Sequence, residues 1–181
     1  MGIIKLPDPV KAVFGVLYHD PEVFEQARRR LEIHFSPVDI LSEKFAFVET
    51  TYYEAEMGPN LTRRYLSLQN LIFPDQLIDL KHLTNLWEEQ WAKEGKRTLN
   101  LDPGYLSASN LVLASSKNFS HRIYLGRGIY AEVTMQYMHS AFEKLPWTYP
   151  DYFHHQEVFL EMRARYKQQL KDWREPQSNE E

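Results

Sequence analysis

Residues 10–35 read VKAVFGVLYHDPEVFEQARRRLEIHF, and this stretch sets the pattern for the rest of the chain. Val10–Tyr18 is apolar and rich in strand-forming residues, which predicts a buried β-strand. Asp20 then offers a side chain that can cap a helix, and Pro21 suits a first helical turn. An apolar stripe at helical spacing predicts that this helix runs to about His34. The chain therefore begins with a strand followed by a helix.

Beyond residue 35 the sequence continues to alternate between extended and helical segments. Runs of β-branched and aromatic residues predict strands, and glycine and proline predict the turns between them. Two apolar stripes at helical spacing predict two more helices. The predicted strands are 45–57, 63–73, 98–102, 111–115, 121–125 and 129–137, the predicted helices are 74–95 and 155–173, and turns are predicted at 58–60 and 103–104.

The last two predicted strands are expected to form a hairpin around residues 126–128. A three-residue loop keeps the apolar side chains of both strands on one face, whereas a two-residue loop would mismatch the faces. That register sets Arg122 opposite Glu132. It also sets Tyr124 opposite Tyr130.

The order strand, helix, strand, strand, helix, strand is the ferredoxin-like βαββαβ pattern. We therefore expect an α+β fold in which this unit is extended by an antiparallel hairpin and a C-terminal helix. The layer rule favours helices packed on one side of a mostly antiparallel sheet. Residues 1–175 are expected to form a single domain, and the polar residues 176–181 a disordered tail.

Composition excludes several classes of function. The 181-residue chain carries 21 Lys and Arg against 25 Asp and Glu, so non-specific coating of nucleic acid is not expected. The lack of cysteine excludes disulfides, thiol nucleophiles and cysteine-bound zinc. No apolar run approaches the roughly 20 residues of a membrane span, and the first residues lack a signal-peptide pattern. We expect a cytoplasmic protein with no membrane partner.

Four segments carry a family resemblance: 100–106 (NLDPGYL), 117–125 (KNFSHRIYL), 128–134 (GIYAEVT) and 147–152 (WTYPDY). Together they resemble the domain of unknown function 4416 family of bacteria and archaea, over nearly the whole chain. Some members carry a GTP-binding label. This sequence has neither the GxxxxGK[ST] loop nor the GxGxxG pattern that cradles phosphates in the common nucleotide-binding folds.

The densest group of chemically active side chains lies between Asp102 and Glu132. Lys117 and Arg122 would hold a phosphate or carboxylate group. Asp102 and Glu132 are the candidate catalytic residues, because either would serve as a base or as a ligand for Mg²⁺. The four residues predict a cleft for a small anionic, phosphate- or nucleotide-like molecule. Whether the chain is an enzyme stays open, as do its cofactor, for which Mg²⁺ is the one candidate, and its oligomeric state.

Four further residues are candidate ligand contacts. Tyr105 and Tyr130 would support the bound molecule. On the predicted helix 74–95, Lys81, Asn85 and Glu88 form one polar ridge that would contribute Lys81 and Glu88 if it borders the same cleft. The alternative is that this ridge is a solvent-facing surface. No HxxxH or HExxH spacing supports zinc, so no metal ligand is assigned.

Each part of this group also has a purely structural interpretation. Asp102 would accept hydrogen bonds from the amides of its own predicted turn, and Arg122 would pair with Glu132 across the hairpin. His121, by alternation, would point toward the core.

A further ion pair is expected outside this group. Glu54 and Glu56 fall on one face of the predicted strand 45–57. Arg63 and Arg64 begin the strand predicted to return beside it. A cross-strand ion pair between the two sets is the simplest interpretation.

The alternative function comes from another class. An exposed aromatic sheet face would make the protein an interaction module that stacks the bases of single-stranded RNA or docks a partner protein. The residues whose orientation decides this are Tyr53, Tyr65, Tyr124 and Tyr130.

Overall fold

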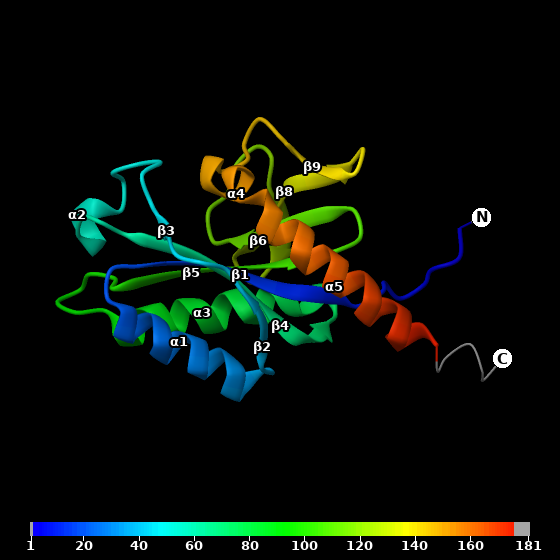
Figure 1. Ribbon diagram of the computed structural model, residues 1–181, viewed down its shortest axis with the longest axis horizontal. Coiled ribbons are helices and arrows are strands. Elements are labelled where there is room, and N and C mark those ends of the chain that lie inside the picture. The colour runs from blue at the N-terminus through cyan, green and yellow to red at the C-terminus, as the bar shows by residue number, and fades with distance from the viewer. Residues whose placement is uncertain (1, 176–181) are drawn as a thin grey trace.

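The computed structural model (Figure 1) describes residues 2–175, which form an α+β structure around one nine-stranded antiparallel sheet. The strands are β1 Val10–Tyr18, β2 Val38–Leu41, β3 Phe45–Ala46, β4 Thr62–Ile72, β5 Leu99–Leu106, β6 Asn110–Ser115, β7 Ile123–Gly126, β8 Ile129–Met138 and β9 Ala141–Lys144. The helices are α1 Pro21–His34, α2 Glu54–Met57, α3 Leu77–Trp91, α4 Pro150–His154 and α5 Gln156–Arg174, with a 3₁₀ turn at Pro74–Gln76 before α3.

The sheet runs in the order β2-β4-β1-β5-β6-β8-β7, with β3 beside β4 and β9 beside β8. Strand β1 lies near its centre and pairs with β4 on one side and β5 on the other. All nine of its residues are buried, as its apolar sequence predicts. Asp20 caps α1 by accepting a hydrogen bond from the amide of Glu22, so the predicted helix start is confirmed.

Helices cover both faces of the sheet (Figure 1). Phe14 and Val16 of β1 belong to a core beneath α1 and α3, which contribute Leu31 and Trp87. The neighbouring Val13 points to the other face. The core on that face lies beneath α5 and contains Phe159, Met162, Tyr166 and Leu170. The expectation that all helices lie on one side is therefore wrong, because α5 returns across the opposite face.

Strand β1 also carries a buried cation on the α5 side. The Lys11 ammonium donates to Asp39 Oδ2 at 2.6 Å, to the Leu68 carbonyl at 2.9 Å and to Gln169 Oε1 at 2.9 Å. These three acceptors use all three of its protons. Burial nevertheless lowers the pKa of Lys11, and the carboxylate of Asp39 offsets part of that effect.

Two sequence predictions of secondary structure are wrong. Residues 45–57 do not form a strand: β3 ends at Ala46, a loop follows, and Glu54–Met57 is helical. Residues 103–104 are not a turn, because β5 continues through them to Leu106. Strand β2, strand β9 and helix α4 were not predicted. The elements carried by long apolar patterns, β1, β4, α1, α3 and α5, are confirmed.

The predicted hairpin is confirmed, with a different loop. Gly126 pairs with Ile129, so the loop is two residues long and Leu125 forms an irregularity in β7. That extra residue restores the predicted pairing of Tyr124 with Tyr130. Residues 176–181, predicted to be a disordered tail, lie outside the described residues. Within residues 2–175 no helix combines the length and apolar character needed to cross a membrane.

Candidate functional site

The sheet splits between β5 and β6. Strand β5 pairs with β1 over its whole length, from Leu99 to Leu106. It pairs with β6 only over residues 104–106. Gly104 stands where the two strands last meet, and a Cβ there would lie 2.4 Å from the carbonyl oxygen of Val112. Beyond this point β5 has a free edge that faces a cleft.

Side chains of α3 form hydrogen bonds with backbone groups along this edge. Glu88 Oε1 accepts from the backbone amide of Leu101 at 2.6 Å, and Lys81 Nζ donates to its carbonyl at 3.4 Å. Backbone groups alternate along a strand, so those of Pro103 point to the same edge as those of Leu101, two residues before it. Pro103 has no amide proton to offer at that edge. A proline is tolerated at such an edge, where no neighbouring strand needs its proton. Because Pro103 and Gly104 both pair with β1, opposite Phe14 and Val13, they continue the strand and do not form a turn.

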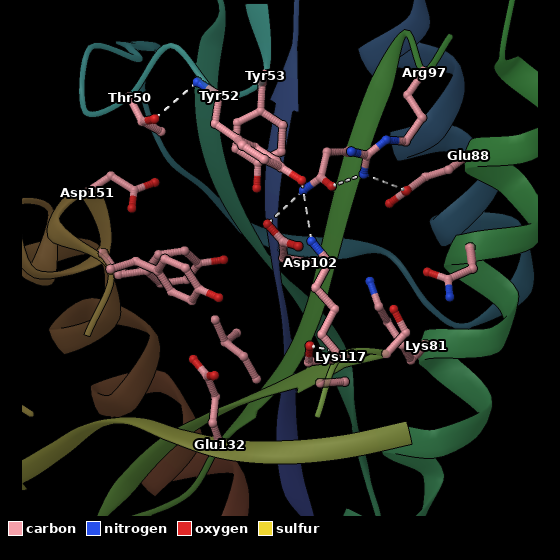
Figure 2. A pocket seen from close by; sticks show the side chains of 18 of the residues that line it. Thr50, Tyr52, Tyr53, Lys81, Glu88, Arg97, Asp102, Lys117, Glu132 and Asp151 are labelled. Carbon is pink, nitrogen blue, oxygen red and sulfur yellow. Dashed lines mark hydrogen bonds and ion pairs between the residues drawn. The ribbon is translucent and has the colours of Figure 1, made fainter. Parts of the chain in front are cut away.

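The cleft at the split has a volume of about 830 Å³. Figure 2 shows that its side chains come from opposite parts of the molecule, with Asp102 near the middle, Lys81 and Glu88 on the α3 side and Asp151 across from them. The lining segments are residues 47–53, the start of β4, α3 with residues 92–97 after it, the first half of β5, residues 113–119, residue 122, part of β8 and residues 149–152.

A buried arginine forms the floor of the cleft. Arg63 Nε lies 2.8 Å from Asp151 Oδ2, an ion pair whose geometry is not aligned as a hydrogen bond. Its Nη1 donates to Asp102 Oδ2 at 3.4 Å. Burial opposes the charge on Arg63, but the carboxylates outweigh it and raise the pKa of the guanidinium. Asp102 Oδ2 also accepts from Asn100 at 2.8 Å, whereas no described residue donates to its Oδ1.

Tyr152 lies beside this cluster with an unused hydroxyl. The hydroxyl is buried and, among the described residues, has no hydrogen-bond partner. It fits because residue 15 is glycine: a Cβ on Gly15 would lie 2.0 Å from the hydroxyl oxygen. Burial raises the pKa of Tyr152 well above its usual value, and the charge of Asp102 adds to this. A neutral, unpartnered phenol therefore borders the cleft floor.

A second arginine closes the α3 side. Arg97 grips Glu56 with two hydrogen bonds, of 2.8 and 2.7 Å, and also donates to Asn100 Oδ1 at 2.8 Å. The hydrogen bond from Arg97 lowers the pKa of Glu56. Burial raises the pKa of Glu88, against the effects of Lys81 and of the Leu101 amide.

The expected ion pair between residues 54 and 56 and the arginines of β4 is absent from the described residues. Glu56 lies on a helix, not on a strand, and pairs with Arg97 instead. Arg63 reaches Asp102 and Asp151. Arg64 donates to the carbonyl of Ser42.

A third arginine organises the wall formed by the hairpin. Arg122 Nε donates to Glu132 Oε2 at 2.7 Å, so the predicted pair across the hairpin is present. The same guanidinium donates to the carbonyl of Lys117 and to the hydroxyl of Tyr149. His121 contacts Glu132 at 3.1 Å and stacks on Trp147, rather than pointing into the core with Ile123, which is exposed. Glu132 is thus fully engaged by its neighbours.

Two lysines of the cleft are not paired with a carboxylate. Among the described lining residues, Lys81 and Lys117 are the cations with no carboxylate oxygen within 4.0 Å. Lys117 is exposed, and its ammonium lies 3.5 Å from the Tyr52 hydroxyl and 5.5 Å from the centre of that ring. Such contacts are weak at an exposed position, so the Lys117 charge is available to a ligand.

The structure brings most of the sequence-predicted residues together. Six of them line the cleft: Asp102, Lys117, Arg122, Glu132, Lys81 and Glu88. The polar ridge of α3 therefore borders the cleft, and its Lys81 and Glu88 are buried rather than solvent-facing. Tyr105 and Tyr130 do not line it. Tyr105 packs near Leu77 and Val112 beneath α3, because it alternates away from Asp102 along β5.

Sequence reasoning did not identify several residues of the site. Arg63 and Arg97 were missed as site residues because their partners are distant in the chain and no local pattern links them. Asp151 and Tyr152 belong to a short helix that was not predicted. The motif WTYPDY contained the signal for both, but it was used only for the family resemblance. The further lining residues missed are Tyr52, Tyr53, Asn100, Phe119 and Tyr149.

The four tyrosines that bear on the alternative function do not form one face. Tyr65 is fully buried, packed beside Phe159 of α5, and Tyr53 and Tyr130 are half-buried. Tyr124 is 59% exposed on the edge strand β7. On the described part of the chain these four tyrosines therefore do not share one exposed face.

Within residues 2–175 no group of three or more His, Asp or Glu side chains has the spacing of a metal site. A divalent ion at the cleft would therefore depend on oxygen atoms of its ligand in addition to Asp102. This is the usual arrangement for Mg²⁺ bound with a phosphate.

The family model described as "Domain of unknown function (DUF4416)" matches residues 8–166 of the chain. The comparison with curated proteins gives no match, and neither does the comparison with solved structures.

Proposed function

We propose that this chain, which belongs to the DUF4416 family, binds a small anionic molecule in the cleft between β5 and β6. The observation that carries the proposal is that the five cations lining the cleft differ in whether a carboxylate pairs with them. The three arginines form ion pairs with carboxylates, whereas Lys81 and Lys117 have no carboxylate oxygen within 4.0 Å among the described residues. A phosphate or carboxylate group entering the cleft would complete the charge balance of these two lysines.

The arginines have a different role in this proposal. Arg122 is held by Glu132 and in turn fixes the backbone of Lys117. It therefore positions the loop that presents Lys117. We assign Glu132 to this positioning role, although the sequence suggested it as a catalytic group, because both Arg122 and His121 already engage it.

Asp102 is the carboxylate with free capacity. Its Oδ2 is held by Arg63 and Asn100, while its Oδ1 has no donor among the described residues. If the bound molecule reacts, Asp102 is the group we propose as the base, or as the protein ligand to a Mg²⁺ ion carried by a phosphate.

The arrangement of the first strands supports a finer proposal about the fold. Strands β2, β4, β1 and β5 are adjacent in that order, and each neighbouring pair is antiparallel. We propose that they form a ferredoxin-like unit, in which β2 takes the place predicted from the sequence for residues 45–57. In this view β6, β8 and β7 are an added sheet, and the cleft lies where the addition joins the unit.

The test is a binding screen on the purified protein with inorganic phosphate, pyrophosphate, sugar phosphates, nucleotides and small dicarboxylates, each with and without Mg²⁺. A ligand at about 100 times its Kd stabilises a protein by about 2.7 kcal/mol, which a thermal-unfolding experiment detects readily. The variant Lys117→Ala should lose the stabilisation, whereas Lys44→Ala, an exposed lysine outside the cleft, should keep it. Loss in both variants, or in neither, would contradict the proposal.

A second candidate function rests on the edge strand β7. Ile123 and Tyr124 are exposed there, and Phe119 is exposed in the preceding loop. Exposed apolar residues at a sheet edge favour docking of a partner protein. A pull-down in which Ile123→Asp releases the partner captured by the wild-type chain would support this function, and unchanged capture would exclude this edge.

A further inference from the structure

The rim of the cleft carries exposed aromatic side chains. Tyr52 is 64% exposed and Phe119 is 63% exposed, and they lie in two different loops that both line the cleft. Tyr149 is a third exposed aromatic residue in the lining. Large aromatic rings are normally buried in a folded protein. Exposed rings that line the same cleft therefore indicate a binding surface.

Lys117 connects these rings to the anion site. Its ammonium rests against Tyr52, at 3.5 Å from the hydroxyl and 5.5 Å from the ring centre, and Phe119 follows two residues later in the same loop. The cation and the ring therefore contact each other. A ligand that offers an anion to Lys117 and a flat ring to Tyr52 would replace this weak contact with two stronger ones.

We propose that the ligand of this cleft is a phosphate attached to a flat ring, specifically a nucleoside phosphate, with the base stacked on Tyr52 and Phe119 and the phosphate held by Lys117 and Lys81. This inference rests on the proposed function and deepens it. Stacking on an aromatic side chain is tolerant of base identity, so the rim favours nucleotides as a class over one particular base. The volume of about 830 Å³ is ample for a ligand of this size.

The experiment compares dissociation constants, measured by isothermal titration, for inorganic phosphate, ribose 5-phosphate, phenyl phosphate and the four common nucleoside 5′-monophosphates. At least one nucleotide should bind about tenfold or more tightly than ribose 5-phosphate, which lacks the base. Phenyl phosphate distinguishes a nucleotide site from a general aryl phosphate site. Binding of phenyl phosphate as tight as that of every nucleotide would overturn the nucleoside assignment.

Variants of the rim test the residues. Tyr52→Ala and Phe119→Ala should each remove most of the advantage of the nucleotide, while the affinity for ribose 5-phosphate stays within about twofold of wild type. Tyr52→Phe should retain the advantage, because it keeps the ring. Tyr124→Ala is the matched control, since Tyr124 is similarly exposed but does not line the cleft. All four variants change one of three exposed residues, and a thermal-unfolding curve confirms folding.

The two proposals fail in different ways. If ribose 5-phosphate binds as tightly as the nucleotides, or if the rim variants bind nucleotides like wild type, the stacking inference is overturned and the anion site stands. If none of the phosphates binds to the folded wild-type chain, the nucleotide inference is overturned, and the proposed function then depends on the carboxylates of the broader screen.

Discussion

Lys11 and Arg63 are both buried cations on the α5 face of the sheet, one on β1 and the other on β4, but their surroundings differ. Lys11 donates to three acceptors and has no proton left to give. Arg63 lies among groups that retain capacity, the Tyr152 hydroxyl and Asp102 Oδ1, and these border the cleft.

Among the described residues no donor or acceptor is left over around Lys11, whereas the neighbours of Arg63 keep unused hydrogen-bonding groups that the proposed ligand would use. Buried charge by itself does not separate the two cases. The number of unused donors and acceptors around it does, and the predictions below test that distinction.

The largest effect is expected from Arg63→Met. Removing this cation leaves Asp151 as an uncompensated buried carboxylate and takes one ion-pair partner from the partly exposed Asp102, which should lower the free energy of unfolding by about 3–5 kcal/mol at pH 7. The loss should shrink at acid pH, because protonation removes the unpaired charges. Urea unfolding at pH 7 and at acid pH measures both. Arg64→Met is the control, and a loss of stability as large as that of Arg63→Met would contradict this interpretation.

Lys11→Met should be nearly as destabilising, at about 3 kcal/mol, and should leave ligand affinity unchanged. The reason is that Asp39 loses its cation while the cleft is untouched. The double variant Lys11→Met/Asp39→Leu should recover much of the stability, because a buried ion pair is replaced by apolar packing. A changed dissociation constant for the cleft ligand in the folded Lys11→Met protein would remove the distinction between the two cations.

A smaller effect is expected where Tyr152 rests on β1. Gly15→Ala places a methyl group against the hydroxyl and ring of Tyr152 and should cost about 1–3 kcal/mol. In the Tyr152→Phe background the same change should cost less, since the closest atom is gone. The coupling in this double-mutant cycle reports the contact, and strict additivity of the two changes would show that the hydroxyl does not lie over Gly15 in solution.

The smallest effect concerns pH and Glu88. Burial raises its pKa in the folded protein above the ordinary value of 4.5. The folded state thus favours the protonated form, and this contribution to stability is present below the unfolded pKa and lost as pH rises through the folded pKa. Glu88→Gln keeps an acceptor for the Leu101 amide. It should reduce the decrease in unfolding free energy between low and neutral pH by about 1 kcal/mol or less. Unfolding curves from pH 4 to 7 measure it, with the exposed Glu89→Gln expected to resemble wild type.

The sequence predicted most reliably those elements whose buried residues follow a regular apolar pattern. The apolar run of β1 and the stripes of α1, α3 and α5 reveal which side each helix buries, and these predictions are confirmed. The prediction of a strand at residues 45–57 failed because the aromatic residues there match a strand pattern. In the structure Phe47 and Tyr53 instead pack beneath the loop against Leu17. Pattern cannot distinguish a ring that faces a sheet from one that anchors a loop.

The candidate site was predicted in part for a related reason. Asp102, Lys117, Arg122 and Glu132 lie within 31 residues of sequence, and local clustering revealed them. Arg63 is joined to Asp151 across 88 positions, a separation over which no spacing rule operates. Only the return of the chain through α4 to the face of β4 brings them together.

Pro103 has a consequence for how the cleft responds to a ligand. Neighbouring strands pair by exchanging amide protons and carbonyls. Beyond Gly104, β5 offers β6 no amide proton, because Pro103 has none and Glu88 already accepts from the Leu101 amide, while Lys81 donates to the Leu101 carbonyl. The pairing of β5 with β6 therefore does not extend across the cleft. The cleft is preorganised: a molecule that enters meets a shape already present, and little of its binding free energy is diverted to reshaping the protein.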